Sequence, residues 1–330
     1  MLWDLLIGPA EEVPLLDDVD AVDAALNSPI GHLTEALLVT LGEQKPGTYE
    51  EISGDSRVRL ERLLIGARPG HRYARVLLAR ATAWLYRLKS ELIVPSFLAR
   101  FEWAGSAEAR EIWLGYLRSP QLTPELWLAL RPHFLDVFPH SADLEASEDQ
   151  FYAFFASILL KPDILFDAGD ARRALQQGTP KGRSHVAWYW WRQADSAPDY
   201  GATLYRERLK YLLTTVWPLE QELREEASSG NLARLAIACR TEFRDAVVTI
   251  TPLLTTVRQP HDVLWGLKED HSDQYPEPTL TLINAIVGNS IERWDWPELR
   301  KILIRLVTAQ PSLAEDPRFL RLDTLLHPFE

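Results

Sequence analysis

The spacing of apolar side chains is the feature that most constrains the fold of this chain. Apolar residues recur every three or four positions, which places them on one face of a helix, whereas a half-buried strand would need strict alternation. The clearest stripes are Leu77, Ala81, Trp84, Leu85, Leu88 and Leu92 in a helix expected at about 70–90; Phe151, Phe154, Phe155, Ile158 and Leu159; Tyr205, Leu209, Leu212, Leu213, Val216, Leu219 and Leu223; and Leu299, Ile302, Leu303 and Leu306. The pattern predicts an all-α fold.

Helix start signals agree with these stripes. A Ser or Thr directly before a Pro supplies a side-chain cap, and Pro is tolerated in the first turn because its nitrogen needs no partner there. Three pairs have this form: Ser28-Pro29, Thr123-Pro124 and Thr179-Pro180. No fixed repeat period emerges along the chain, so we expect about a dozen helices in an irregular array or solenoid-like bundle.

The length of 330 residues exceeds that of a usual single domain. The polar stretch 139–149 interrupts two aromatic-rich helical regions and is the best boundary in the sequence. We therefore expect an N-terminal helical subdomain at 1–140 and a C-terminal one at 141–330.

The compartment is suggested by three features of the sequence. Cys239 is the single cysteine, so no internal disulfide can form. The first residues are acidic and contain prolines, unlike a signal peptide, and no run of about 18 apolar residues could span a bilayer. We expect a cytoplasmic protein without membrane contact.

Charge is distributed unevenly. The net charge is -12, yet residues 1–54 carry eleven acids and one base while residues 55–100 carry ten bases and three acids. In the expected helix, basic side chains lie opposite the Leu and Trp stripe: Arg68, Arg72, Arg75, Arg80, Arg87 and Lys89. This face could contact phosphates or dock against the acidic first 54 residues. Because the chain is acidic and has no aromatic or glycine pattern of an RNA-binding module, nucleic-acid binding through this face is only a second alternative to protein binding.

Four consecutive aromatic residues, from Trp188 through Tyr189 and Trp190 to Trp191, lie beside His185 and Arg192. Neighbouring residues of a helix point about 100 degrees apart, so the four cannot all face one core. At least one must reach a second surface. That surface is another part of the chain, a protein partner or a small ligand stacked on an indole.

Familiar catalytic patterns are absent from the sequence. The glycines form neither a phosphate-binding loop nor a dinucleotide-binding turn, and no two histidines have zinc-protease spacing. Four aspartates near the start of the sequence, Asp17, Asp18, Asp20 and Asp23, have the wrong spacing for an aspartate-rich magnesium site and are interpreted as acidic surface or as partners for basic residues. We expect no metal, no cofactor and no catalysis, the alternative being an unfamiliar helical active site that uses His185, Arg192 and acids brought together by the fold.

Three segments carry a resemblance to a known family. The string NSPIGHLTEALL at 27–38, IWLGYL at 112–117 and ELWLALRPHFL at 125–135 resemble a helical C-terminal domain of unknown function. That domain is appended to SIR2-like enzymes in bacterial antiviral defence proteins. In the first string, Gly31 would let a neighbouring helix come close, and Leu33, Leu37 and Leu38 would form a buried stripe.

The resemblance implies a sensing or scaffold region, because the NAD-cleaving chemistry of such proteins belongs to a SIR2-like domain that this sequence lacks. We therefore expect a helical interaction module that binds a protein partner or an effector domain. Self-association stays open. The candidate interaction residues are the aromatic cluster with His185 and Arg192, together with Arg72, Arg75, Arg80 and Arg87.

Overall fold

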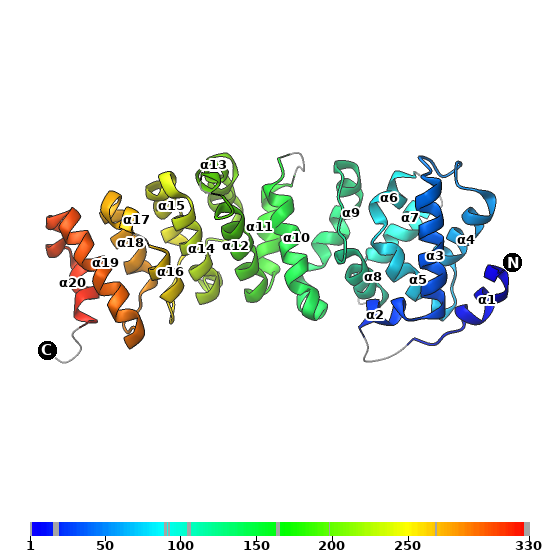
Figure 1. Cartoon of the computed structure of the whole chain (residues 1–330), viewed down its shortest axis with the longest axis horizontal. Coiled ribbons are helices and arrows are strands. Elements are labelled where there is room, and N and C mark those ends of the chain that lie inside the picture. The colour runs from blue at the N-terminus through cyan, green and yellow to red at the C-terminus, as the bar shows by residue number, and fades with distance from the viewer. Residues whose placement is uncertain are drawn as a thin grey trace. The chain divides into compact units, whose positions relative to one another are not determined.

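The computed structural model describes residues 2–15, 20–88, 91, 93–103, 107–162, 166–197, 199–267 and 269–326. The predicted all-α fold is confirmed, since helices follow one another throughout these ranges (Figure 1). Within them, extended pairing is limited to one isolated bridge between Val257 and Val287. No helix in the described part of the chain is long and apolar enough to cross a membrane.

The chain divides into two compact units, the first ending at Phe154 and the second beginning at Phe155. The helices of the first unit are α1 (Leu2–Glu11), α2 (Ala21–Leu26), α3 (Pro29–Gln44), α4 (Gly54–Ile65), α5 (Pro69–Ala79), α6 (Thr82–Arg87), α7 (Ile93–Leu98), α8 (Ala107–Leu117) and α9 (Pro124–Asp136). Helix α10 (Glu148–Leu160) contains the division between the units.

The second unit contains ten further α-helices, which follow one another in chain order (Figure 1). They are α11 (Ala168–Gln177), α12 (Pro180–Ala194), α13 (Tyr200–Leu204), α14 (Glu226–Ala238), α15 (Phe243–Ile250), α16 (His261–Gly266), α17 (Glu269–Gln274), α18 (Pro276–Ile286), α19 (Trp296–Ala309) and α20 (Pro317–Thr324). After α13 come two π-helical turns, Tyr205–Leu209 and Leu212–Val216. The described residues thus form more and shorter helices than the dozen expected.

The three predicted caps are present. The hydroxyl of Ser28 accepts a hydrogen bond from the Gly31 amide at 3.0 Å, and that of Thr123 accepts one from the Leu126 amide at 3.2 Å. Thr179 caps α12 in the same way. These helices begin where the sequence predicts because capping needs only residues within one turn.

The helix expected at about 70–90 is instead two helices. Helix α5 ends when the Ala81 amide bonds to the carbonyl of Leu78, three residues back, at 2.9 Å. The hydroxyl of Thr82 then donates to the Ala79 carbonyl at 2.5 Å, which satisfies a group that a continuing helix would use. The chain turns between α5 and α6, so the basic residues do not share one helical face. Lys89 lies outside the described residues.

The boundary between the units falls after the polar stretch 139–149. Residues Phe138–Ser147 form a 3-10 helix that joins α9 to α10. Across it, the ring of Phe151 lies 4.9 Å from the rings of both Phe134 and Phe138. The start of α10 therefore packs into the first unit, and the polar loop does not separate two cores.

Two glycines of the resembling segments permit close helix crossings in the first unit. A Cβ atom on Gly31 would lie 1.8 Å from the carbonyl oxygen of Ala25 in α2, and one on Gly115 would lie 2.0 Å from that of Val76 in α5. The close approach expected at Gly31 is confirmed. In this chain these residues determine packing and not chemistry.

Candidate interaction site

The aromatic cluster on α12 divides between core and surface. Trp190 is fully buried, and its indole N–H donates to the Ala156 carbonyl at 3.3 Å. Trp188 remains 39% exposed, with the His185 ring 4.9 Å away. Trp191 and Tyr189 are half-buried. The geometry agrees with the expectation that the four cannot all face one core.

Trp191 faces a second helix of the same unit. The guanidinium carbon of Arg234, on α14, lies 3.4 Å from the centroid of the Trp191 ring. Arg192 approaches the same ring to 5.4 Å. A guanidinium so close to an indole face is a cation–π contact, which fixes both side chains.

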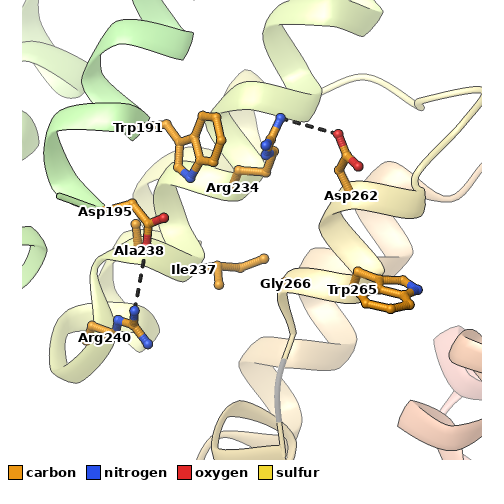
Figure 2. A pocket seen from close by; sticks show the side chains of 9 residues that line it. All are labelled: Trp191, Asp195, Arg234, Ile237, Ala238, Arg240, Asp262, Trp265 and Gly266. Carbon is orange, nitrogen blue, oxygen red and sulfur yellow. Dashed lines mark ion pairs between the residues drawn. The ribbon is translucent and has the colours of Figure 1, made fainter. Parts of the chain in front are cut away.

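Trp191 and Arg234 line a hollow of about 260 Å³ in the second unit (Figure 2). Helices α12, α14 and α16 supply most of its walls. The lining residues are Trp191, Asp195, Arg234, Ile237, Ala238, Arg240, Asp262, Trp265 and Gly266. Aromatic, guanidinium, carboxylate and aliphatic groups thus meet at one concave surface.

Each arginine of the hollow has a loosely paired acid. Arg234 lies 3.4 Å from Asp262, and Arg240 lies 3.6 Å from Asp195, as the dashed lines in Figure 2 show. These distances exceed those of a charge-assisted hydrogen bond. Partial burial lowers the pKa of Arg234. Arg240 has a φ of 51°, in a region that side-chain-bearing residues rarely adopt, and this backbone turn follows directly after α14.

The floor of the hollow is backed by a close helix approach. A Cβ atom on Gly201 of α13 would lie 2.1 Å from the Ala238 carbonyl oxygen and 2.8 Å from that of Ala194. Only a glycine lets α13 press against the ends of α12 and α14 in this way. The ends of α12 and α14, which precede Asp195 and Arg240, are therefore held together.

Exposed aromatic side chains extend the site along α16. Trp265 is 67% exposed, and its ring lies 5.7 Å from that of His261, one turn earlier. His261 Nδ1 lies 2.8 Å from a carboxylate oxygen of Asp295, which is fully buried. Next to Asp295, Trp294 is 62% exposed. The contact between His261 and Asp295 thus joins the two segments that carry these exposed indoles.

The predicted basic face is engaged in ion pairs within the first unit. Arg75 is only 5% exposed as a side chain and pairs with Glu108. Arg72 pairs with Glu111, and Arg80 pairs with Glu35 at 2.6 Å. These three arginines do not form an open row for phosphates. Arg87 is exposed and borders a separate hollow between α6 and the start of α9.

Docking against the acidic N-terminal segment accounts for part of this basic stretch. Arg68 pairs with Glu12 at 2.6 Å, and Arg62 donates from Nη2 to Glu11 at 2.7 Å. Glu11 is 1% exposed. The opposite charges of the two segments therefore join α1 to α4 and α5.

Sequence reasoning missed Arg234, Arg240 and Trp265. They come from segments separated by turns, and no local motif marks them. Only Trp265 could have been noticed in the sequence, as a tryptophan in a short helical segment of six residues between prolines and polar residues. Conversely, His185 and Arg192, which the sequence suggested for an active site with acidic residues, do not line the hollow that contains Asp195 and Asp262.

Metal ligands do not gather in the described part of the chain, where no group of three or more His, Cys, Asp or Glu residues could hold an ion. Asp17 and Asp18 lie outside the described residues. Asp20 instead caps α2, accepting hydrogen bonds at 3.0 Å from the amides of Val22 and Asp23. Its carboxylate is explained by helix capping.

Comparison with known proteins identifies a relative but no family. No family model matches the chain, and no solved structure matches it. The chain is 22% identical, over 342 aligned positions, to the uncharacterized protein y4cA of Sinorhizobium fredii. The match covers 98% of this chain and 28% of the relative, so the chain spans little more than a quarter of that protein's length.

Proposed function

We propose that this chain is a non-catalytic helical interaction module that binds a protein partner through the hollow between α12, α14 and α16. The observation that carries the proposal is Trp265, 67% exposed at the edge of a hollow that also contains the Trp191–Arg234 contact. Trp and Arg are the residue types most enriched among residues that dominate binding energy. An exposed indole beside a concave surface is suited to anchor a partner.

Preorganisation supports the same proposal. Arg234 is held by its contact with Trp191, so less side-chain entropy is lost when a partner binds. The Gly201 contact fixes the helix ends behind the hollow. A rigid aromatic and arginine surface costs less to bind than a mobile one.

The role of this module as a sensor or scaffold in bacterial antiviral defence is part of the proposal. It is supported by the resemblance at 27–38, 112–117 and 125–135. The match to part of a longer protein also suits a module that works beside other domains. The partner is then an effector, either in the same chain or in a separate one.

Affinity capture tests the proposed function. The tagged wild-type chain and a Trp265→Ala variant are each incubated with extract of the native host, with and without phage infection. We expect a stoichiometric protein to be recovered by the wild type and not by the variant. Recovery that is equal for both chains would contradict the proposed site.

A second candidate function is catalysis at His261. The buried carboxylate of Asp295 lies 2.8 Å from Nδ1 of His261, whose side chain is 47% exposed, as the orienting acid lies against the general base in a catalytic triad. The test is hydrolysis of a small activated ester by the wild type and by His261→Gln. Equal rates would remove this candidate.

A further inference from the structure

The charges that line the hollow are balanced, and they lie at its two ends. Arg234 is 3.4 Å from Asp262 at one end, and Arg240 is 3.6 Å from Asp195 at the other (Figure 2). The guanidinium of Arg234 is also stacked on the Trp191 ring. A charged group that entered the hollow would meet both an opposite and a like charge at each end, so it would lose hydration without a net attraction. The lining therefore disfavours a charged occupant.

The floor of the hollow between the two ion pairs is apolar. Figure 2 shows the side chain of Ile237 between the pairs, directed toward Gly266 of α16. Ile237 is 8% exposed, so it forms the floor and leaves the space above it open. Gly266 has no side chain to fill that space, and a Cβ atom there would lie 3.4 Å from Cδ1 of Ile237, at ordinary contact distance. The centre of the hollow therefore suits an aliphatic side chain.

The hollow is large enough for one such side chain. Its volume is about 260 Å³, and an apolar cavity of about 150 Å³ binds benzene. A partner's side chain that covers Ile237 and reaches the exposed indole of Trp265 removes apolar surface of both proteins from water. At the two ends, the side chains of Asp262 and Asp195 are 68% and 40% exposed, so the ion pairs form a hydrated rim. An apolar centre within a polar rim is the arrangement of protein interfaces.

We propose that the protein partner places one uncharged aliphatic side chain, of about the size of leucine, on Ile237 between the two ion pairs. This inference rests on the proposed function, since it names the chemistry of the partner at the same site. Gly266 leaves room for the side chain, and Trp265 contacts it from the edge of the hollow. The ion pairs stay intact and select against charged side chains.

Fluorine NMR of the full chain labelled with 5-fluorotryptophan tests this inference. Trp191→Phe and Trp265→Phe variants assign the two signals of the site. The probes are blocked peptides, acetyl-Ala-Xaa-Ala-amide, in which Xaa is leucine, alanine, aspartate or lysine. We expect the leucine peptide to shift the Trp265 signal and to bind about tenfold more tightly than the alanine peptide, because it buries a larger apolar side chain. The aspartate and lysine peptides should bind no more tightly than the alanine peptide.

One substitution locates the effect. Gly266→Ala adds a methyl group above Ile237, in the space that the partner's side chain would take, and the helical backbone at this position accepts alanine. It should weaken binding of the leucine peptide about tenfold, since the two side chains compete for the same space. The matched control is Gly230→Ala in α14, where a Cβ would meet nothing within 4 Å, and it should bind the peptide as the wild type does. Thermal unfolding of both variants shows whether the fold is retained.

The remaining outcomes separate this inference from the proposed function. Equal binding of the leucine and alanine peptides, or no shift of the Trp265 signal, overturns the inference. Tighter binding of the aspartate or lysine peptide also overturns it and assigns a charged occupant, and so does unchanged binding of the leucine peptide to Gly266→Ala. If capture depends on Trp265 while the peptides bind alike, the proposed function stands and only this inference fails. If the leucine peptide binds as expected while capture is independent of Trp265, the side-chain preference stands and the proposed function fails.

Discussion

Glu11 accepts a hydrogen bond from His71 Nε2 at 2.8 Å, which defines the protonation of the imidazole. The other ring nitrogen, Nδ1, accepts from the Arg68 amide at 3.1 Å and so carries no proton. Nε2 therefore bears the proton, and the ring is neutral. Because the N-terminal cap of α5 depends on an unprotonated Nδ1, acid disrupts the cap.

This geometry predicts that stability falls as the pH decreases from 7.5 to 5.5. Burial lowers the pKa of His71 below its usual value of 6.5, outweighing the opposing influence of Glu11. The unfolded chain therefore binds more protons than the folded chain once the pH is below 6.5, which favours unfolding. Urea denaturation at several pH values measures this slope.

The slope should become smaller in His71→Gln, whereas replacing the exposed His32 with Gln should leave it unchanged. Glu11 contributes in a lower range. Its pKa is lowered mainly by its hydrogen bond with Arg62, so the stability it provides is lost only below about 4.5. A wild-type free energy of unfolding that is constant between pH 7.5 and 5.5 would contradict this account of His71.

The surroundings of two glycines predict opposite effects on stability when each is replaced by alanine. Gly115→Ala should destabilise the chain by about 1–3 kcal/mol, since the new methyl group overlaps the Val76 carbonyl. Gly42→Ala should be neutral or stabilising by up to about 1 kcal/mol, because a Cβ at Gly42 in α3 would meet nothing within 4 Å. Chemical denaturation of both variants checks this, and similar effects would refute the crossing argument.

The two kinds of tryptophan in the second unit should also differ. Trp190→Ala should cost about 3–5 kcal/mol of stability, because it removes a fully buried indole. Trp265→Ala should change stability by less than about 0.5 kcal/mol, since that side chain is 67% exposed. If Trp265→Ala unfolds the chain, Trp265 is a core residue and cannot serve as a binding anchor.

Cys239 gives a direct measure of opening in the second unit. The thiol is fully buried, and burial raises its pKa. We expect the native chain to react very slowly with a thiol reagent at pH 8 and the urea-unfolded chain to react at once. Since the chain has a single cysteine, the signal has one source. Rapid, complete labelling of the native chain would contradict the burial.

The structural features that could be predicted from the sequence depend on residues close together in the chain. Apolar spacing gave the fold class, and Ser28, Thr123 and Thr179 gave helix starts, because a cap is formed within one turn. Spacing could not tell which tryptophan of the cluster is buried. That depends on the helices packed against α12, which place Trp190 inward and Trp191 beside Arg234.

Contacts between distant residues were beyond sequence reasoning. In the sequence, Arg75 looks like a surface arginine. In the structure it pairs with Glu108, which lies 33 positions later in the chain. The hollow likewise combines residues from 191 to 266, and no pattern within one helix marks them. The division within α10 was hidden because Phe151 packs backward onto Phe134 and Phe138.

The central claim is that a protein partner binds at the hollow between α12, α14 and α16, and the dissociation constant of that complex tests it most directly. The constant is measured for the wild type, for Trp265→Ala and for Leu128→Ala, an apolar side chain that is 72% exposed in the first unit. We predict that Trp265→Ala weakens binding on the order of thirtyfold, as loss of an aromatic anchor does, and that Leu128→Ala has no effect. Unchanged affinity for Trp265→Ala would contradict the claim.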